Sequence, residues 1–546
     1  MNWFKQMGRG RTEAKSACLP TSSLRPQPSA LSSLYSRWLI FATATPLFLS
    51  VVVLGMQAEA GAKGLNSETA ALKNTVNPAI VISQKRPSPN SLCPAQLGGT
   101  LNRITKRVGS ARWGILVQTL DQNTNRKALF ALNPTTLLIP ASNNKLFTTA
   151  AVLTKLGAQY RMRTSVYGDG MTSELANVRI VGRGDPSFTT TQLAALAQQL
   201  SQKGIQQVTQ LIGDDTYFRG SATNAYWDRD DTLTGYGAPV NSLMLNQNGI
   251  GLTLFPQQVG QPLRVQWDDP ADPSRWRLSN RAVTASAGAG EYVDAYREPN
   301  QWMIRIEGQL QAGSEPEPVA VSVPNPGNYL VAKFRTALEN ARIKVTDTTV
   351  VKSTPTPANL MELGAIDSPP LAQLLVETNQ ESNNIYAEAL LKTLGKVQTP
   401  ANLNATESGI AAVKSVLSPL GINSAAYRMV DGSGLATQDR ASAEALVQTL
   451  QAMAESSNAQ VYRNSLAIAG VKGTLKKRFR GTPVEGNLFA KTGTISGVIA
   501  LSGYLNPPNY SPLALSIIVN YSDGSPSAIR NAVDGIVLTL AQLKPC

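Results

Sequence analysis

The chain has 546 residues, enough for more than one domain and for a sizeable buried core. Its composition, 42% hydrophobic and 16% charged, excludes disorder throughout. The formal net charge of +14 is spread along the chain without the familiar nucleic-acid-binding motifs, so we expect no nucleic-acid partner. The chain contains no histidine, which excludes a Ser-His-Asp triad.

Residues 1–60 predict an export signal. A basic stretch ends at Arg37, the run Trp38–Met56 is apolar, and Ala58-Glu59-Ala60 has the small-x-small pattern of a signal-peptidase site. We expect cleavage after Ala60 and an exported protein, periplasmic or in the cell envelope. Because the run is long enough to span a membrane, an uncleaved anchor is the alternative, and this leader would be the protein's one membrane contact.

Residues 61–91 are rich in small and polar residues and predict a flexible linker. Without the leader, two cysteines remain, Cys93 and Cys546. In an oxidising compartment they could form one disulfide that ties the chain ends together. Two separate thiols are the alternative, because the sequence does not show how far apart they lie.

Residues 92–160 are predicted to form the first part of a catalytic domain. The patterns indicate a helix to about Arg107, a β-hairpin, and a helix that ends at Gly157. Ser142 lies at the start of this last helix, and Lys145 follows three residues later on the same face. A serine needs a base to become a nucleophile, and without histidine a nearby lysine is the main candidate.

Residues 161–325 alternate short strand-like runs with Gly, Asp and Pro turns, which is typical of a β-rich inserted accessory region. A Pro-rich link closes it. Residues 326–546 are predicted to form the second part of the catalytic domain, with a helix at Tyr329–Asn340 and mostly helices from about Leu371 to Glu485. Two strands and a closing helix follow, predicted at Gly497–Leu505, Leu513–Tyr521 and Ser525–Leu543.

Two further motifs follow Ser142-x-x-Lys145 in the chain. They are Ser382-Asn383-Asn384, at a helix start, and Lys491-Thr492-Gly493-Thr494, which we place just ahead of a strand. Each alone could be only a helix cap or a strand entry. Together and in this order they match the set found in class A β-lactamases and penicillin-binding proteins.

The spacing narrows this match, because Ser382 follows Lys145 by 237 residues and the predicted insert fills that gap. The arrangement resembles the penicillin-binding protein 4 type of D-alanyl-D-alanine carboxypeptidase (peptidase family S13). Supporting segments are Gly182-Arg183-Gly184-Asp185-Pro186, Asp431-Gly432-Ser433-Gly434-Leu435 and Gly470-Val471-Lys472-Gly473-Thr474-Leu475. The resemblance implies an α/β (α+β) penicillin-binding or serine β-lactamase-like transpeptidase fold. That fold has an antiparallel sheet flanked by helices, here with a large β-rich inserted region.

The resemblance and the chemistry together assign roles. Ser142 is the predicted nucleophile and Lys145 its base, which must be neutral, so burial and a second cation such as Lys491 should lower its pKa. Ser382 would relay a proton to the leaving amine. Asn384 would hold the substrate amide and Lys145.

The segment Lys491-Thr492-Gly493-Thr494 is predicted to bind the free carboxylate of the substrate peptide. By resemblance, the backbone N–H groups of Ser142 and Thr494 form an oxyanion hole. No metal or other cofactor is expected for this chemistry.

We therefore predict an exported serine DD-peptidase that cleaves the terminal D-Ala-D-Ala bond of peptidoglycan peptides through an acyl-enzyme on Ser142. Cleavage of D-Ala cross-links would use the same groups, and β-lactams would act as inhibitors. One alternative is a serine β-lactamase, although the chain lacks the Glu-x-x-Leu-Asn loop of class A enzymes. Another is a non-catalytic penicillin-binding or peptidoglycan-sensing protein.

Overall fold

The computed structural model describes residues 91–109, 111–120, 126–353, 356–400, 404–521 and 525–546. The predicted leader, and the predicted linker up to residue 90, lie outside these ranges. Within them, no helix is both long and apolar enough to cross a membrane.

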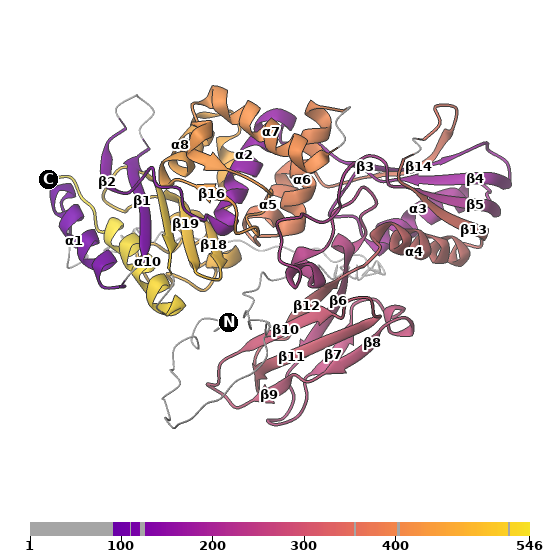
Figure 1. Cartoon of the computed structure of the whole chain (residues 1–546), viewed down its shortest axis with the longest axis horizontal. Helices are drawn as coiled ribbons and strands as arrows, with labels where there is room; N and C mark the ends of the chain where they lie inside the picture. Colours follow the sequence, from indigo (N-terminus) through magenta and orange to yellow (C-terminus); the bar gives the residue numbers. More distant parts are fainter. Residues whose placement is uncertain (1–90, 110, 121–125, 354–355, 401–403, 522–524) are drawn as a thin grey trace, which may run out of the picture. The chain divides into compact units, whose positions relative to one another are not determined.

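A six-stranded antiparallel sheet forms the centre of the catalytic part (Figure 1). Its strands, in spatial order, are β17 (Ala467–Ile468), β18 (Leu488–Ile495), β19 (Val498–Leu505), β20 (Leu513–Asn520), β1 (Arg112–Thr119) and β2 (Ala128–Leu132). Every residue of β19 is buried, as expected for a strand covered on both faces.

Helices cover the two faces of this sheet. The closing helix α10 (Pro526–Leu540) and α1 (Pro94–Lys106) pack against one face in one apolar core. On the other face a second core contains residues of α2 (Lys145–Leu156) and α8 (Ala443–Glu455). This core also includes residues of α5 (Leu371–Asn379), α6 (Asn384–Gln398) and α7 (Ala405–Leu417). The predicted fold class, an antiparallel sheet flanked by helices, is confirmed.

The inserted region contains three further sheets. A five-stranded sheet has the order β13 (Lys344–Val351), β5 (Gln207–Asp214), β4 (Glu174–Val181), β3 (Arg163–Gly168) and β14 (Met361–Asp367). Helices α3 (Thr190–Gln202) and α4 (Pro326–Asn340) share its apolar core. One smaller sheet is made of β12 (Glu317–Ser322), β6 (Gly249–Phe255) and β7 (Arg264–Trp267), and the other of β8 (Arg277–Asn280), β9 (Val283–Ala285), β10 (Tyr292–Arg297) and β11 (Met303–Gln311).

The strand pairing places the end of the insertion later than we predicted. Strands β13 and β14 follow residue 325, yet they pair with β5 and β3. The chain therefore returns to the first inserted sheet before it enters α5. The Pro-rich stretch that suggested a boundary at residue 325 contains β12, and α4 then leads from it to β13 of the first inserted sheet.

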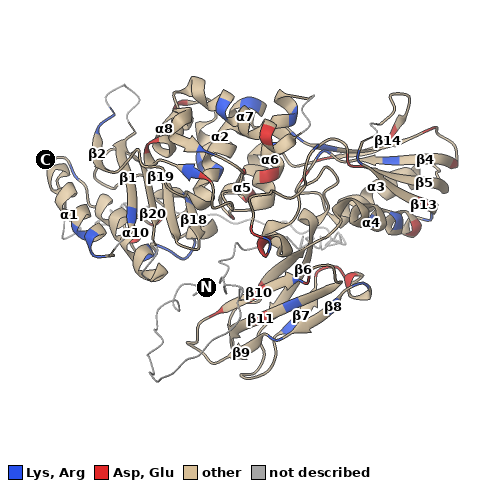
Figure 2. Cartoon of the chain, in the orientation of Figure 1, with Lys and Arg blue, Asp and Glu red and all other residues tan. Residues whose placement is uncertain are grey.

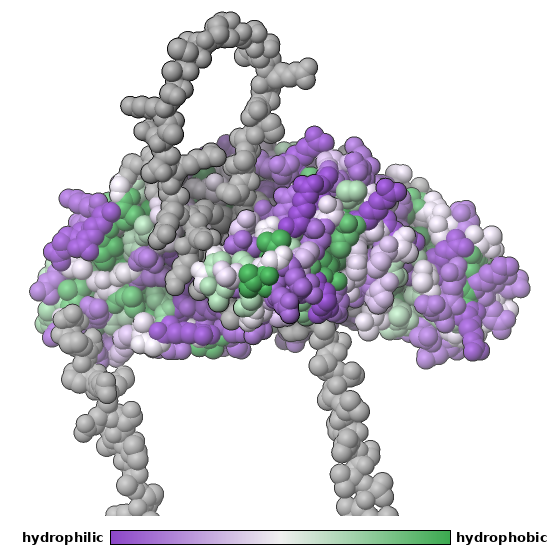
Figure 3. All heavy atoms as spheres, turned by 90° about the horizontal axis from the view of Figure 1, so that it is seen from below, coloured by the Kyte–Doolittle hydropathy of each residue, from purple (hydrophilic) through white to green (hydrophobic). Residues whose placement is uncertain are grey.

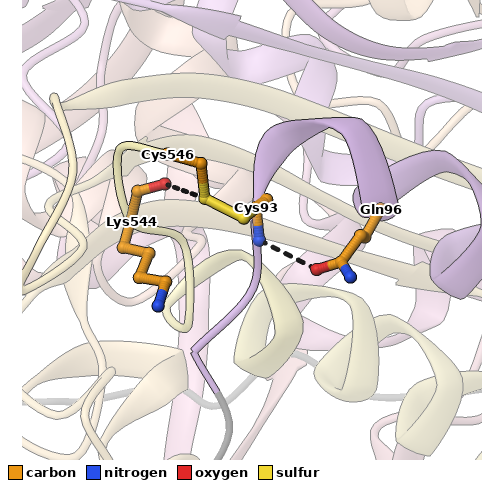
Figure 4. The surroundings of a disulfide bond; sticks show 4 residues. All are labelled: Cys93, Gln96, Lys544 and Cys546. Atoms are coloured by element: carbon orange, nitrogen blue, oxygen red, sulfur yellow. Dashed lines mark hydrogen bonds between the residues drawn. A yellow bond between two sulfur atoms is a disulfide. The ribbon is translucent and has the colours of Figure 1, made fainter.

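Cys93 and Cys546 form a disulfide, so the alternative of two separate thiols is wrong (Figure 4). Their Cα atoms lie 5.8 Å apart, within the usual range. Next to the bond, Leu92 N–H donates to the Gln542 carbonyl and Lys544 N–H donates to the Leu92 carbonyl. The ends of the described chain are thus held together both covalently and by backbone hydrogen bonds.

Basic and acidic positions are interspersed along the described chain rather than collected in one stripe (Figure 2). The face shown in Figure 3 likewise carries apolar surface in separate small patches among hydrophilic residues. Neither view singles out one surface as a binding face, so the functional site is better located from its side-chain contacts.

Candidate active site

Ser142 lies in a tight turn that leads into the core. It belongs to the 3-10 segment η1 (Ala141–Asn144), which runs directly into α2. Ala141 has a positive φ of 47°, and two glycines allow neighbouring backbone to approach it closely. A Cβ on Gly434 would lie 1.9 Å from the Ala141 carbonyl oxygen, and one on Gly493 would lie 2.8 Å from the Pro140 oxygen. Gly434 and Gly493 are therefore both needed, because a side chain at either position would keep its segment away from the serine turn.

Lys145 begins α2 and is fully buried. Its Nζ lies 3.0 Å from Ser142 Oγ, and it donates to Asn384 Oδ1 (2.7 Å) and to the Ser433 carbonyl (2.8 Å). The last two atoms can only accept. A neutral amine has two N–H groups, which these acceptors occupy, and its lone pair then faces the serine hydroxyl. The site can thus pass a proton from Ser142 to Lys145.

The protonation of Lys145 is biased by its surroundings. Burial lowers the pKa of Lys145 to about 7, and the nearby carboxylates of Asp431, Glu388 and Asp439 oppose this shift. Burial is therefore the cause, as expected, whereas the expected contribution of the cation Lys491 is not seen. Instead, burial and then the charge of Lys145 lower the pKa of Lys491 well below its ordinary value, which Glu381 opposes.

The second motif joins the first through Asn384 and the third through Ser382. Ser382 has a φ of 61° and its Oγ accepts a 2.8 Å hydrogen bond from Lys491 Nζ. Asn383 caps α6, because its Oδ1 accepts from the backbone N–H groups of Ile385 and Tyr386. The Asn383 side chain thus has a structural use at the start of α6.

The third motif lies just ahead of β19, as predicted, but it is itself part of a strand, β18, that we did not predict. Thr492 Oγ1 donates to Thr474 Oγ1 over 2.7 Å, so the Gly470–Leu475 segment borders the same place. Thr492 and Thr494 remain partly exposed, whereas Lys491 and Gly493 are buried. Within this motif the side chains of the two threonines are therefore partly open to a ligand.

Sequence reasoning missed the acceptor role of Ser433. The Asp431 carboxylate accepts from Ser433 N–H, Gly434 N–H and Ala436 N–H, and this fixes the turn so that the Ser433 carbonyl faces Lys145. The Asp-Gly-Ser-Gly pattern indicates such a turn, but it does not reveal which carbonyl meets the lysine.

The inserted region also reaches the site. Asn384 Nδ2 donates to the Tyr236 carbonyl (3.2 Å), which directs its Oδ1 to Lys145. Trp227 Nε1 donates to Asp431 Oδ2 over 2.9 Å. The insertion therefore supports Asn384, which accepts a hydrogen bond from Lys145, and Asp431, which fixes the turn that carries the Ser433 carbonyl. In the described ranges, no group of three or more Cys, Asp or Glu side chains could hold a metal ion.

A serine at a helix start, a buried lysine against it and a Lys-Thr-Gly strand beside it define the class of penicillin-recognising serine enzymes. The sequence profile of the D-Ala-D-Ala carboxypeptidase 3 (S13) family matches residues 98–542, and the chain belongs to this family. The family and the serine carboxypeptidase activity predicted from the sequence are confirmed.

Individual relatives agree. A D-alanyl-D-alanine carboxypeptidase of Actinomadura sp. (strain R39) is 34% identical over 413 residues, or 72% of this chain and 76% of that protein. The D-alanyl-D-alanine carboxypeptidase DacB of Haemophilus influenzae is 24% identical over 426 residues, covering 75% and 87%. The crystal structure of penicillin binding protein 4 (dacB) from Haemophilus influenzae has a TM-score of 0.67 at 22% identity, covering 80% of this chain and 99% of that one, which shows the shared fold.

Proposed function

We propose that the protein is an exported DD-peptidase that removes the terminal D-alanine of peptidoglycan peptides through an acyl-enzyme on Ser142. The observation that carries this proposal is the contact of Lys145 Nζ with Ser142 Oγ at 3.0 Å. The other hydrogen bonds of that amine go to atoms that only accept. A neutral Lys145 takes the hydroxyl proton as Ser142 attacks the carbonyl carbon of the penultimate D-alanine.

The remaining motif residues act on the charges that develop during acyl transfer. The backbone N–H groups of Ser142 and Thr494 stabilise the oxyanion, and the close approach of Gly493 to the serine turn supports this pairing. Lys491, Thr492 and Thr494 bind the carboxylate of the leaving D-alanine. Ser382, whose Oγ accepts a hydrogen bond from Lys491, relays to the leaving amine the proton that Lys145 took from Ser142. Water then releases the acyl group.

β-Lactams present a reactive amide and a carboxylate in a spatial relation like that of the scissile bond and the terminal carboxylate of the peptide. They therefore acylate Ser142 and inhibit the enzyme. The penicillin binding protein 4 of Haemophilus influenzae has been crystallised in complex with a β-lactam, and its shared fold supports this part of the proposal. Cleavage of D-alanine cross-links uses the same groups. Export follows from the sequence of residues 1–60 and places the enzyme in the periplasm or cell envelope.

D-Alanine release from a muramyl pentapeptide tests the mechanism. We expect Ser142→Ala to lower kcat/KM by about 10³-fold or more, because the nucleophile is lost while binding remains. Ser496→Ala, which removes an exposed hydroxyl in the turn between β18 and β19, is the matched control and should keep wild-type activity. Equal activity of wild type and Ser142→Ala would exclude the acyl-enzyme.

Nitrocefin separates the peptidase from the β-lactamase alternative. A single stoichiometric burst, with a mass increase on the peptide that contains Ser142, is expected for the peptidase. Steady hydrolysis at a comparable rate to D-alanine release would contradict the assignment.

A further inference from the structure

A cavity of about 410 Å³ lies between the inserted region and α6, away from the serine turn. Its lining includes Arg219, Lys352 and Lys392 and one carboxylate, Asp215. Lys392 lies on the same face of α6 as Asn384, two turns further on, which is about 12 Å along the helix axis. The cavity is therefore separate from the catalytic groups but shares a helix with them.

Lys392 is the deepest cation of this cavity, with 4% of its surface exposed. Its Nζ donates to the Val240 carbonyl (2.7 Å) and to the Ser221 carbonyl (3.0 Å). An ammonium group has three N–H donors, so one remains for the cavity that Lys392 lines. Within the described chain Lys392 forms no ion pair, although the buried carboxylates of Glu388 and Asp215 lie near enough to favour its charged form. An anion in the cavity would add the direct ionic contact that this charge lacks.

Asp215 does not serve as this partner. One carboxylate oxygen accepts from the backbone N–H groups of Ser242 (2.8 Å) and Leu243 (3.3 Å), and the other accepts from Asn241 Nδ2 (3.0 Å). Within the described chain Asp215 forms no ion pair with Lys392. Its charge is used to hold the loop that precedes β6.

Arg219 and Lys352 are exposed, and backbone hydrogen bonds hold the segments from which they project. The Arg219 carbonyl accepts from Ala405 N–H at the start of α7, and Val351, next to Lys352, accepts from Asp215 N–H. Neither cationic side chain forms an ion pair with another described residue. Three cations thus face one cavity, whereas the one carboxylate that lines it is already occupied.

We infer that this cavity binds a small ligand with a carboxylate or phosphate group. Lys392 would bind the anion at depth, and Arg219 and Lys352 would bind it or a second anionic group at the mouth. Phe218 and Val240 supply apolar lining, and the volume is that of a site for a small molecule or a short peptide segment. The inference goes beyond the proposed function and does not depend on acylation of Ser142.

Calorimetric titration of the whole protein tests the inference with two anionic probes. The N-acetylated dipeptide L-Ala-γ-D-Glu carries carboxylates and no D-alanine, its diamide is the uncharged control, and inorganic phosphate is the second probe. We expect at least one anionic probe to bind wild type and the diamide to bind at least tenfold more weakly. Binding of the dipeptide alone points to a peptide carboxylate as the ligand, and binding of phosphate alone points to a phosphate.

The double variant Arg219→Gln/Lys352→Gln should raise the Kd of the bound probe at least about tenfold, because two exposed cations are lost without loss of a buried contact. Lys344→Gln, at the opposite end of β13, removes an exposed cation outside the cavity and should leave the Kd within twofold of wild type. Absence of binding by both probes, or an equal Kd in the double variant, would overturn the inference.

Proton uptake tests the contact with Lys392 itself. Burial lowers the pKa of Lys392 to about 8, while Glu388 and Asp215 oppose this shift, so at pH 8 much of the amine is neutral. A bound anion raises this pKa, and binding at pH 8 should take up protons, seen as a dependence of the heat on the buffer. Binding with no uptake at pH 8 would place the anion away from Lys392 and contradict the proposed site.

Discussion

At the scale of single residues, the direction of the hydrogen bonds around Lys145 matters more than their number. Asn384 Oδ1 and the Ser433 carbonyl can only accept, whereas the Ser142 hydroxyl can either donate or accept. A charged lysine and a neutral one are therefore both satisfied in the same geometry. The proton can move between Ser142 and Lys145 without rearrangement of the neighbouring groups.

The pKa of about 7 for Lys145 predicts the pH dependence of the reaction. The base must be neutral, so kcat/KM for D-alanine release should fall tenfold per pH unit below about pH 7 and level off above it. The measurement is a pH profile of kcat/KM on pentapeptide, with protein stability checked at each pH. A profile that stays flat down to pH 5 would show that Lys145 is not the base.

At the scale of elements, the site depends on backbone segments that approach one another more closely than side chains would allow. Gly434 has a φ of 79°, and a Cβ there would collide with the Ala141 carbonyl oxygen at 1.9 Å. Gly421 has a similar φ of 84°, but a Cβ there would meet no atom within 4 Å. The two positions therefore separate backbone strain from steric collision.

Gly421→Ala should lower the free energy of unfolding by about 1–2 kcal/mol from the left-handed backbone alone. Gly434→Ala should cost about 1–3 kcal/mol more, because the collision adds to the same strain, and it should also displace the turn that carries Ser142. Urea midpoints and D-alanine release for both variants check this. Equal losses of stability in the two variants would mean that η1 moves away from the added Cβ without a further loss in the free energy of unfolding, which would contradict the prediction.

At the scale of the whole molecule, one disulfide closes nearly the entire described chain, because Cys93 and Cys546 are 453 residues apart in sequence. It joins the segment before α1 to the end that follows α10, and these two helices share a core over one face of the sheet. If α1 and α10 detached from this face of the sheet, a large apolar area would be exposed to water. The bond therefore protects the catalytic sheet rather than the site directly.

Cys546→Ser should lower the free energy of unfolding by about 2–5 kcal/mol, because the unfolded chain loses a long covalent loop. The backbone hydrogen bonds of Leu92 remain, so the folded protein should keep its activity at moderate temperature. The test compares unfolding midpoints with and without reductant. Reduced wild type should match Cys546→Ser, and the variant should not respond to reductant. Identical midpoints for oxidised wild type and the variant would contradict the prediction.

The sequence by itself determined the family, the fold class and the order of the three motifs. These follow from residue types at short fixed spacings, from the 237-residue gap between the first two motifs, from the absence of histidine and from hydrophobic patterns, all of which can be read along the chain without knowing how it packs. The assignment of roles to Ser142, Lys145, Ser382, Asn384 and the Lys491–Thr494 segment stays a prediction, although the structure brings these residues together.

Only the tertiary structure decided features that depend on distant contacts. The motif of Lys491 lies inside β18, and β13 and β14 return to the inserted sheet. The Ser433 carbonyl, the support from Tyr236 and the cationic cavity at Lys392 likewise come from segments more than 100 residues apart in the chain. Burial, strand partners and facing charges are set by how segments pack, which local sequence patterns do not encode.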